Sequence, residues 1–123
     1  HLDTWTNERI AAAAHYDELL ANHPSLTLPR TPKNYKHVYH LFVVRTEKRN
    51  ALQAHLNANG VGNAIHYPTP LPAMECYQPL NTPESDYFVA TEACKRILSL
   101  PMFGELSAEE IKRVANILPR DSY

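Results

Sequence analysis

The sequence has 123 residues, of which 44% are hydrophobic and 20% are charged, and its formal net charge is -1. This is an ordinary globular balance with room for one modest core, so we expect a single domain over residues 1–123. Charges of both signs are interspersed, which does not favour a nucleic acid partner. No apolar run approaches the ~20 residues that span a bilayer, and residues 1–7 lack a signal-peptide pattern, so we expect a cytoplasmic protein with no membrane partner.

The first part of the chain predicts a helix, a surface connection and a strand. Residues 4–22 contain four consecutive alanines, and their larger apolar side chains fall near one face of a helix. Residues 25–35 carry prolines and no apolar periodicity, which is typical of a surface connection. In residues 37–46 both faces of an extended chain would be mostly apolar, which predicts a central strand covered on both sides.

The middle of the chain predicts a crossover helix, a second strand and a long loop. Thr46 is a candidate N-cap for the helix, and Gly60 is expected to end it. Residues 63–67 are expected to form a short strand that the following prolines end. The loop over residues 68–82 is long for a compact domain, and such loops are usually functional or disordered.

The last part predicts a helix, a third strand and a final helix. Ser85 is expected to start the first of these helices, in which Val89, Ala93 and Ile97 recur at four-residue spacing, and residues 98–102 are expected to form the strand. Ser107 and Glu110 match a capping box. A buried stripe is expected to follow on the final helix: Ile111, Val114, Ile117 and Leu118. The alternation of helix and strand by itself would favour a parallel sheet.

Cysteine and histidine positions do not indicate a metal site. Cys76 and Cys94 are too few for a disulfide-built fold, so we expect both to be reduced, with Cys94 packed in a helix. His37 and His40 would lie on opposite faces of an extended strand and could not share an ion. The sequence has no CxxC, no HExxH and no local signature of a nucleophilic Ser or Cys. We therefore expect neither a metal nor a catalytic residue in this chain.

His66 and Tyr67 are the candidate binding residues. They lie where a predicted strand runs into a proline-rich loop, and alternation would place their side chains on opposite faces. Loops held at sheet ends often carry binding groups, whereas a histidine beside a loop is often only a hydrogen-bonded structural residue. Position alone leaves both interpretations open.

Four pieces of the sequence occur together in an order that resembles a known family. They are a helix with Trp5, Arg9 and Tyr16, the segment VYHLFVVR at 38–45, the run Gly60 to Pro68 that ends in His-Tyr-Pro, and LSLPMF at 98–103. These pieces resemble the carboxy-terminal domain of the DegT/DnrJ/EryC1/StrS aminotransferases over nearly the whole chain. The resemblance implies the small domain of fold-type I pyridoxal phosphate transferases, with an α+β (α/β) fold. This domain is a two-layer sandwich in which helices cover a small, mainly antiparallel, three-stranded sheet.

The resemblance also implies an activity for the parent protein. Such enzymes use pyridoxal phosphate to transfer an amino group from glutamate to a nucleotide-linked keto sugar, in the synthesis of surface polysaccharides or antibiotic sugars. They are typically homodimers. In these enzymes the segment similar to His66-Tyr67-Pro68 lies near the cleft, so the resemblance implies that His66 or Tyr67 contacts the nucleotide sugar.

The lysine that binds pyridoxal phosphate is expected to lie outside this chain. All five lysines occupy charged or proline-flanked positions typical of the solvated surface. In the family that lysine belongs to a large domain, which would precede His1. Residues 1–23 resemble the later part of the helix that links the two domains, and the start with His rather than Met suggests a cut piece. The chain alone is therefore expected neither to bind the cofactor nor to transaminate.

A second hypothesis is a free-standing small-molecule-binding or regulatory α+β domain without catalysis. The missing catalytic lysine fits it equally well. An autonomous domain should have an initiator Met and a polar first helix, whereas a fragment should expose Leu2 and Trp5 for packing on another domain.

Overall fold

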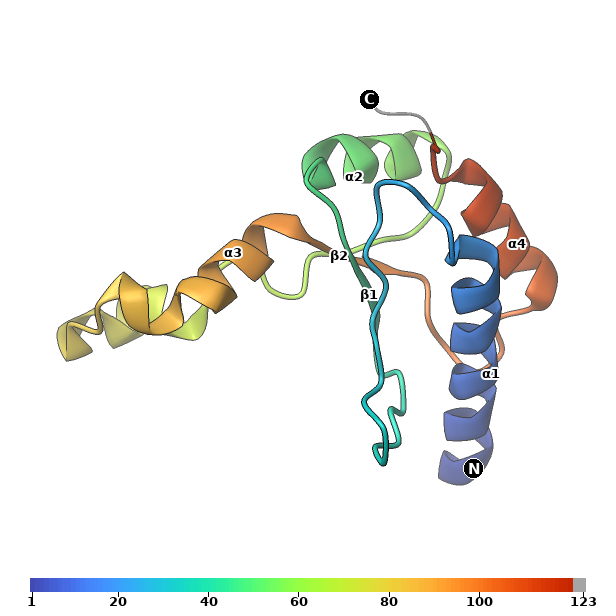
Figure 1. Ribbon diagram of the computed structural model, residues 1–123, viewed down its shortest axis with the longest axis horizontal. Helices are drawn as coiled ribbons and strands as arrows, with labels where there is room; N and C mark the ends of the chain where they lie inside the picture. Colours follow the sequence, from blue (N-terminus) through green and yellow to red (C-terminus); the bar gives the residue numbers. More distant parts are fainter. Residues whose placement is uncertain (121–123) are drawn as a thin grey trace.

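The computed structural model describes residues 1–120. Its helices and strands (Figure 1) are α1 (Leu2–Leu20), β1 (Phe42–Arg45), α2 (Arg49–Ala58), α3 (Phe88–Arg96), β2 (Ile97–Leu100) and α4 (Ala108–Ile117). Three short 3-10 helices lie between α2 and α3: η1 (Leu71–Ala73), η2 (Glu75–Leu80) and η3 (Glu84–Tyr87).

The sheet is an antiparallel pair of strands with one face toward the core. Phe42 lies opposite Leu100, and Val44 lies opposite Leu98. Opposed residues of an antiparallel pair point to the same face, and all four of these side chains are buried. The opposed pair Val43 and Ser99 therefore points to the other face.

Helices α1, α2 and α4 cover the core face of the sheet. In Figure 1, α1 and α4 lie side by side, and α2 lies across one end of the strands. The largest fully buried side chains come from both layers: Tyr16, Leu20, Phe42, Val44, Leu56, Leu98, Ile111 and Leu118. This arrangement of helices with a small antiparallel sheet confirms the predicted α+β class, and the parallel sheet suggested by alternation alone is wrong.

The sheet of the described residues has two strands rather than the predicted three. The expected strand at 63–67 makes a single bridge, in which Ala64 pairs with Ser99 of β2. Pairing stops after one residue pair because the next hydrogen-bonded pair on one side would join Gly62 to Pro101, which has no N–H, and on the other side the chain bends at His66. The segment still runs along the edge of β2.

The first strand is shorter than predicted and is buried on one face. It begins at Phe42 rather than at residue 37, because Tyr39 has a φ of 48°, a left-handed conformation that interrupts an extended chain. Val38 is exposed, and Val43 is only half-buried. The expectation of a central strand covered on both sides is wrong.

Local sequence signals predict two of the helix ends and miss a third. Gly60 has a φ of 68° just after α2, as expected for a helix stop. The capping box of α4 is present, with the Ser107 hydroxyl accepting from the Glu110 N–H. Thr46 is not the N-cap of α2, which is Lys48; the Thr46 hydroxyl instead accepts a 3.3 Å hydrogen bond from the Lys48 N–H.

Residues 71–96 form an arm that extends away from the body of the fold (Figure 1, left). The helix predicted from Ser85 is there, but its first turn is 3-10 and α3 begins at Phe88. Val89 is 81% exposed, so the predicted apolar spacing does not mark a buried stripe within this chain. Cys94 is half-buried in α3 and, like Cys76, is a free thiol, as predicted.

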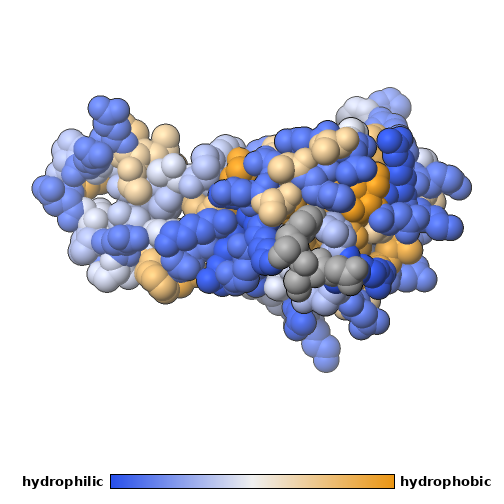
Figure 2. Space-filling view, turned by 90° about the horizontal axis from the view of Figure 1, so that it is seen from above, coloured by the Kyte–Doolittle hydropathy of each residue, from blue (hydrophilic) through white to orange (hydrophobic). Residues whose placement is uncertain are grey.

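The surface of the described residues is mixed in character. Figure 2 shows a mainly hydrophilic face, with apolar side chains in small groups between the charged ones. Exposed large apolar side chains occur on α1 and along the arm: Leu2, Trp5, Leu71, Met74, Tyr77, Leu80, Phe88 and Val89. No helix within residues 1–120 combines the length and apolar character needed to cross a bilayer.

Candidate functional site

His66 lies beside β2 on the face of the sheet opposite the core. Ala64 and Ser99 exchange two backbone hydrogen bonds, of 3.3 Å from the Ala64 N–H and 2.8 Å from the Ser99 N–H. Two residues further on, the His66 side chain returns to the same side. Its Nδ1 lies 3.0 Å from the Ser99 hydroxyl oxygen. The predicted binding residue is thus anchored to the sheet.

The segment before His66 is tied to α2 through Asn63. The Asn63 side-chain amide donates to the Val61 carbonyl at 3.0 Å and to the Asn57 side-chain oxygen at 2.7 Å. Its own oxygen accepts from the Gln53 amide at 3.1 Å. Three hydrogen bonds hold this one side chain, and they restrain the path of the chain from α2 to His66.

A pocket of about 270 Å³ opens at this place. Its lining combines apolar side chains with a few polar groups and includes Leu41, Asn63, His66, Ser99, Pro101 and Met102. An apolar wall with a small number of convergent polar groups is the usual character of a small-molecule site. The His66 imidazole and the Ser99 hydroxyl are among these polar groups.

Tyr67 is placed differently from His66. It is 73% exposed and does not belong to the lining of this pocket, and its ring meets the His66 ring edge-on with centroids 6.0 Å apart. The phenol is therefore largely exposed to solvent. The two candidates face different surroundings, but not through strand alternation, since residues 63–67 form no strand beyond the Ala64 bridge and the two rings contact each other.

Sequence analysis did not identify Ser99 as part of this site. The available signal was a serine within the apolar strand Ile97–Leu100, where a hydroxyl needs a hydrogen-bond partner. Leu41 and Met102 were also unforeseen, because their contribution depends on how β1 and β2 pair.

A second hollow, of about 640 Å³, lies on another part of the surface. Its lining includes Asp17, Arg30, Thr31 and Tyr39. Burial raises the pKa of the Asp17 carboxyl above its ordinary value. Neither of the predicted site residues borders this hollow.

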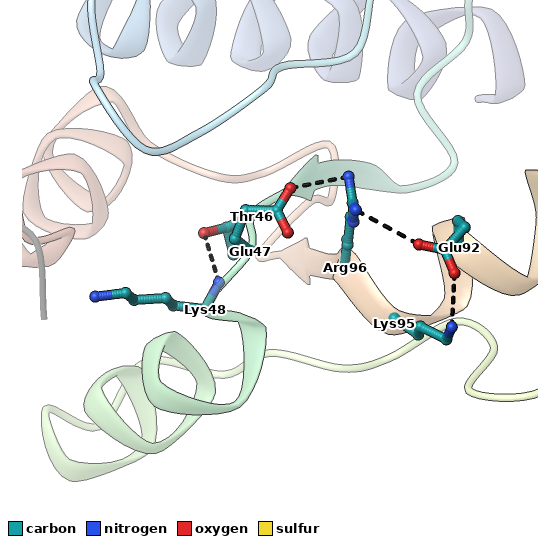
Figure 3. Close-up of polar contacts among 6 residues, drawn as sticks. All are labelled: Thr46, Glu47, Lys48, Glu92, Lys95 and Arg96. Atoms are coloured by element: carbon teal, nitrogen blue, oxygen red, sulfur yellow. Dashed lines mark hydrogen bonds and ion pairs between the residues drawn. The ribbon is translucent and has the colours of Figure 1, made fainter.

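An ion pair joins the arm to the end of β1, and two more lie within α3. Arg96 lies 2.8 Å from Glu47 and 3.4 Å from Glu92, while Lys95 lies 2.6 Å from Glu92 (Figure 3). The hydrogen bond from Lys95 lowers the pKa of the Glu92 carboxyl, to which the charges of Lys95 and Arg96 add. Glu47 follows β1 and Arg96 ends α3, so this network joins the arm to the strand end.

Comparison with known proteins identifies the family. The model of the DegT/DnrJ/EryC1/StrS aminotransferase family matches residues 1–119. The chain belongs to this family. The resemblance carried by the four sequence pieces is thereby confirmed.

Individual family members are similar over nearly the whole chain. The erythromycin biosynthesis sensory transduction protein EryC1 of Saccharopolyspora erythraea is 40% identical over 114 residues, which are 93% of this chain and 31% of that protein. The dTDP-3-amino-3,4,6-trideoxy-alpha-D-glucose transaminase of Streptomyces venezuelae is 39% identical over 114 residues, 93% of this chain and 30% of that protein. The crystal structure of S. venezuelae DesV superposes with a TM-score of 0.87 and 37% identity, over 95% of this chain and 32% of that one. The chain thus spans about a third of the length of the relatives that it matches.

The residues of this chain do not fit the cofactor of the family. Aminotransferases of this kind use pyridoxal phosphate, which requires a lysine amine that is desolvated or has a lowered pKa. All five lysines are exposed here: Lys33, Lys36, Lys48, Lys95 and Lys112. The hydrogen bond to Glu92 raises the pKa of Lys95, which is opposite to what an amine nucleophile needs. Residues 1–120 therefore offer no lysine suited to the cofactor.

Proposed function

We propose that this chain is the carboxy-terminal small domain of a pyridoxal phosphate-dependent aminotransferase. The parent enzyme transfers an amino group from glutamate to a nucleotide-linked keto sugar, in the cytoplasm, for polysaccharide or antibiotic sugar synthesis. The observation that carries this proposal is the family match over residues 1–119. The name of the S. venezuelae relative, a transaminase of a dTDP-linked amino sugar, supports the substrate class.

The part of this chain in the reaction is substrate binding rather than proton transfer. His66 lines the pocket beside β2 and can hydrogen-bond to oxygen atoms of the sugar or its phosphates. The exposed Tyr67 ring beside it can cover the substrate from the outside. Pyridoxal phosphate supplies the electron sink of the reaction when it is bound by the remainder of the polypeptide.

The exposed apolar side chains support the proposal that this chain packs against another domain or subunit. Leu2 and Trp5 on α1 are exposed, as a domain that packs on another would require. We propose that α1 belongs to the connection with a large cofactor-binding domain, and that the complete enzyme is a homodimer. The apolar side chains of the arm, among them Leu80 and Phe88, would then be covered by the large domain or the second subunit.

The mass and absorbance spectrum of the natural polypeptide test the proposal. We expect a mass about three times that of this chain, because 114 matched residues are 31% of the EryC1 relative. We also expect a cofactor absorbance band that changes on borohydride reduction. A natural product of 14.0 kDa without this band would favour the autonomous binding or regulatory domain instead.

The role of His66 is tested by replacement in the full-length protein. His66→Ala should weaken binding of dTDP-glucose, a stable nucleotide-sugar probe, roughly 3- to 30-fold, as expected for a lost hydrogen bond and some lost contact. The cofactor spectrum should be unchanged. His15→Ala, on the exposed side of α1, serves as the control. Loss of the cofactor spectrum in His66→Ala would show that His66 acts on the cofactor site instead.

A further inference from the structure

We propose that Ser99 is a positioning residue for His66. The Ser99 hydroxyl donates a hydrogen bond to Nδ1 of the imidazole and thereby leaves the N–H on Nε2, as a donor for an oxygen atom of the nucleotide sugar. This inference rests on the proposed substrate role of His66. It assigns a function to a buried side chain that does not itself need to contact the substrate.

The surroundings of Ser99 explain why its hydroxyl needs a partner. It is the only polar residue of β2, stands between the buried Leu98 and Leu100, and is 4% exposed. A buried hydroxyl without a hydrogen bond is costly, since it has lost its water. Among the described residues, the side-chain partner of this hydroxyl is His66, at 3.0 Å.

Backbone pairing makes the contact a fixed feature of the fold. Ala64 and Ser99 exchange both of their backbone hydrogen bonds, which sets the register of residues 64–66 against β2. Side chains two residues apart in an extended segment point to the same side. His66 is therefore brought to the side of Ser99 by the path of the chain, which Asn63 also restrains through its bonds to α2.

Hydrogen-bond accounting decides which group donates. A neutral imidazole has one N–H and one bare nitrogen, and a hydroxyl has one O–H and two lone pairs. If Nδ1–H donated to Ser99, the buried serine O–H would be left without an acceptor. If the serine O–H donates to Nδ1, every buried donor is satisfied, and only serine lone pairs remain free. The second arrangement is the favoured one, because buried donors without partners are rarer than under-satisfied acceptors.

The consequence for recognition follows from the tautomer. With Nδ1 occupied by Ser99, the imidazole presents Nε2–H, a donor suited to hydroxyl, carbonyl or phosphate oxygens. A nucleotide-linked sugar carries all of these acceptors. The pocket that His66 and Ser99 share thus selects for a ligand with an oxygen acceptor at this point.

The tautomer can be measured directly in the full-length protein without any ligand. We expect the nitrogen NMR spectrum of histidine-labelled protein, well above the ordinary imidazole pKa, to show His66 with a bare Nδ1 and a protonated Nε2. The resonances are assigned by their loss in His66→Ala. Ser99→Ala should give a mixture of tautomers, and Ser99→Thr, which keeps the hydroxyl, should restore the single one. A protonated Nδ1 in the wild-type protein, or no change in Ser99→Ala, would overturn the inference.

Probe binding then separates positioning from a general structural effect. Ser99→Ala should weaken dTDP-glucose binding roughly 3- to 10-fold, and should have no further effect when His66 is already alanine. Thr46→Val, which removes another buried hydroxyl at the end of β1, is the matched control and should change neither the tautomer nor binding. Equal weakening by Ser99→Ala in both backgrounds would mean a structural role alone. If His66→Ala leaves probe binding unchanged, the proposed substrate role fails, while the tautomer measurement still decides the role of Ser99.

Discussion

The Tyr16 hydroxyl donates a 3.1 Å hydrogen bond to the carbonyl oxygen of Pro101, which follows β2. The same ring stacks on Phe42 of β1 with centroids 4.8 Å apart. Burial, together with the negative charge of Glu110, raises the pKa of the Tyr16 phenol, so the hydroxyl stays a donor. One side chain of α1 thus contacts β1 and the segment that follows β2, and Pro101 in that segment also lines the candidate site.

Removal of the Tyr16 hydroxyl should destabilise the fold. Tyr16→Phe leaves the Pro101 carbonyl without this donor and keeps the ring stacking, so we expect a loss of about 1 kcal/mol in the free energy of unfolding. Urea denaturation of the 123-residue chain, followed by circular dichroism, measures this. Tyr35→Phe is the control, because Tyr35 is 75% exposed and its change should stay within about 0.5 kcal/mol. Equal effects of the two variants would show that the hydrogen bond does not stabilise the fold.

Gly60 and Gly62 form a matched pair for the effect of backbone conformation. A Cβ would have open space at both positions, but only Gly60 has a positive φ, of 68°. Gly60→Ala should therefore cost about 1 kcal/mol through strain at the end of α2. Gly62→Ala should be neutral or stabilise by up to ~1 kcal/mol, because alanine restricts the unfolded chain. The urea midpoint of Gly60→Ala should therefore be lower than that of Gly62→Ala. A lower midpoint for Gly62→Ala would contradict the prediction.

The capping box of α4 gives a prediction about helix stability. Ser107→Ala removes the hydroxyl that accepts from the Glu110 N–H, so we expect a loss of about 1 kcal/mol. Ser85→Ala, an exposed hydroxyl in the arm, should have little effect. Urea denaturation of both variants provides the measurement, and an unaltered midpoint in Ser107→Ala would contradict the capping role.

The same capping box should be sensitive to acid. Hydrogen bonds from the side chain and backbone of Ser107 lower the pKa of Glu110 from its usual 4.5. The folded state therefore prefers the ionised carboxylate, and this contribution to stability is present above pH 4.5 and is lost as the pH falls through the lowered value. The difference in the free energy of unfolding between wild type and Glu110→Gln should shrink on acidification. A difference that stays constant with pH would contradict this role of the Glu110 carboxylate.

His23 should make stability depend on pH in the neutral range. Burial lowers the pKa of the His23 imidazole below 6.5, and the positive charge of Arg120 adds to this effect. The unfolded chain then takes up a proton at higher pH than the folded chain does. The contribution of His23 to the free energy of unfolding is fully present above pH 6.5 and decreases as the pH falls toward the lowered pKa. His23→Gln should flatten the urea midpoint against pH in this range, whereas His15→Gln, on an exposed position, should not.

The candidate site was only partly predictable. His66 was predicted as a binding residue because it stands beside prolines at the end of a predicted strand, and because the family resemblance implied a substrate contact there. Its partner Ser99 is 33 residues away, and only the pairing of Ala64 with Ser99 brings the two side chains together. The difference between the pocket position of His66 and the exposed position of Tyr67 likewise depends on β2 as a neighbour.

The sequence by itself determined the features that depend on neighbouring residues and those carried by family motifs. The helix stop at Gly60 and the capping box at Ser107 are present because backbone conformation and nearby hydrogen bonds decide them. The motifs also predicted the family and the antiparallel sheet. Only the tertiary structure decided where strands begin and end, since the left-handed turn at Tyr39 and the single bridge at Ala64 depend on packing between distant segments. For the same physical reason it alone identified Ser99: a contact between residues far apart in sequence exists only when the whole chain is folded.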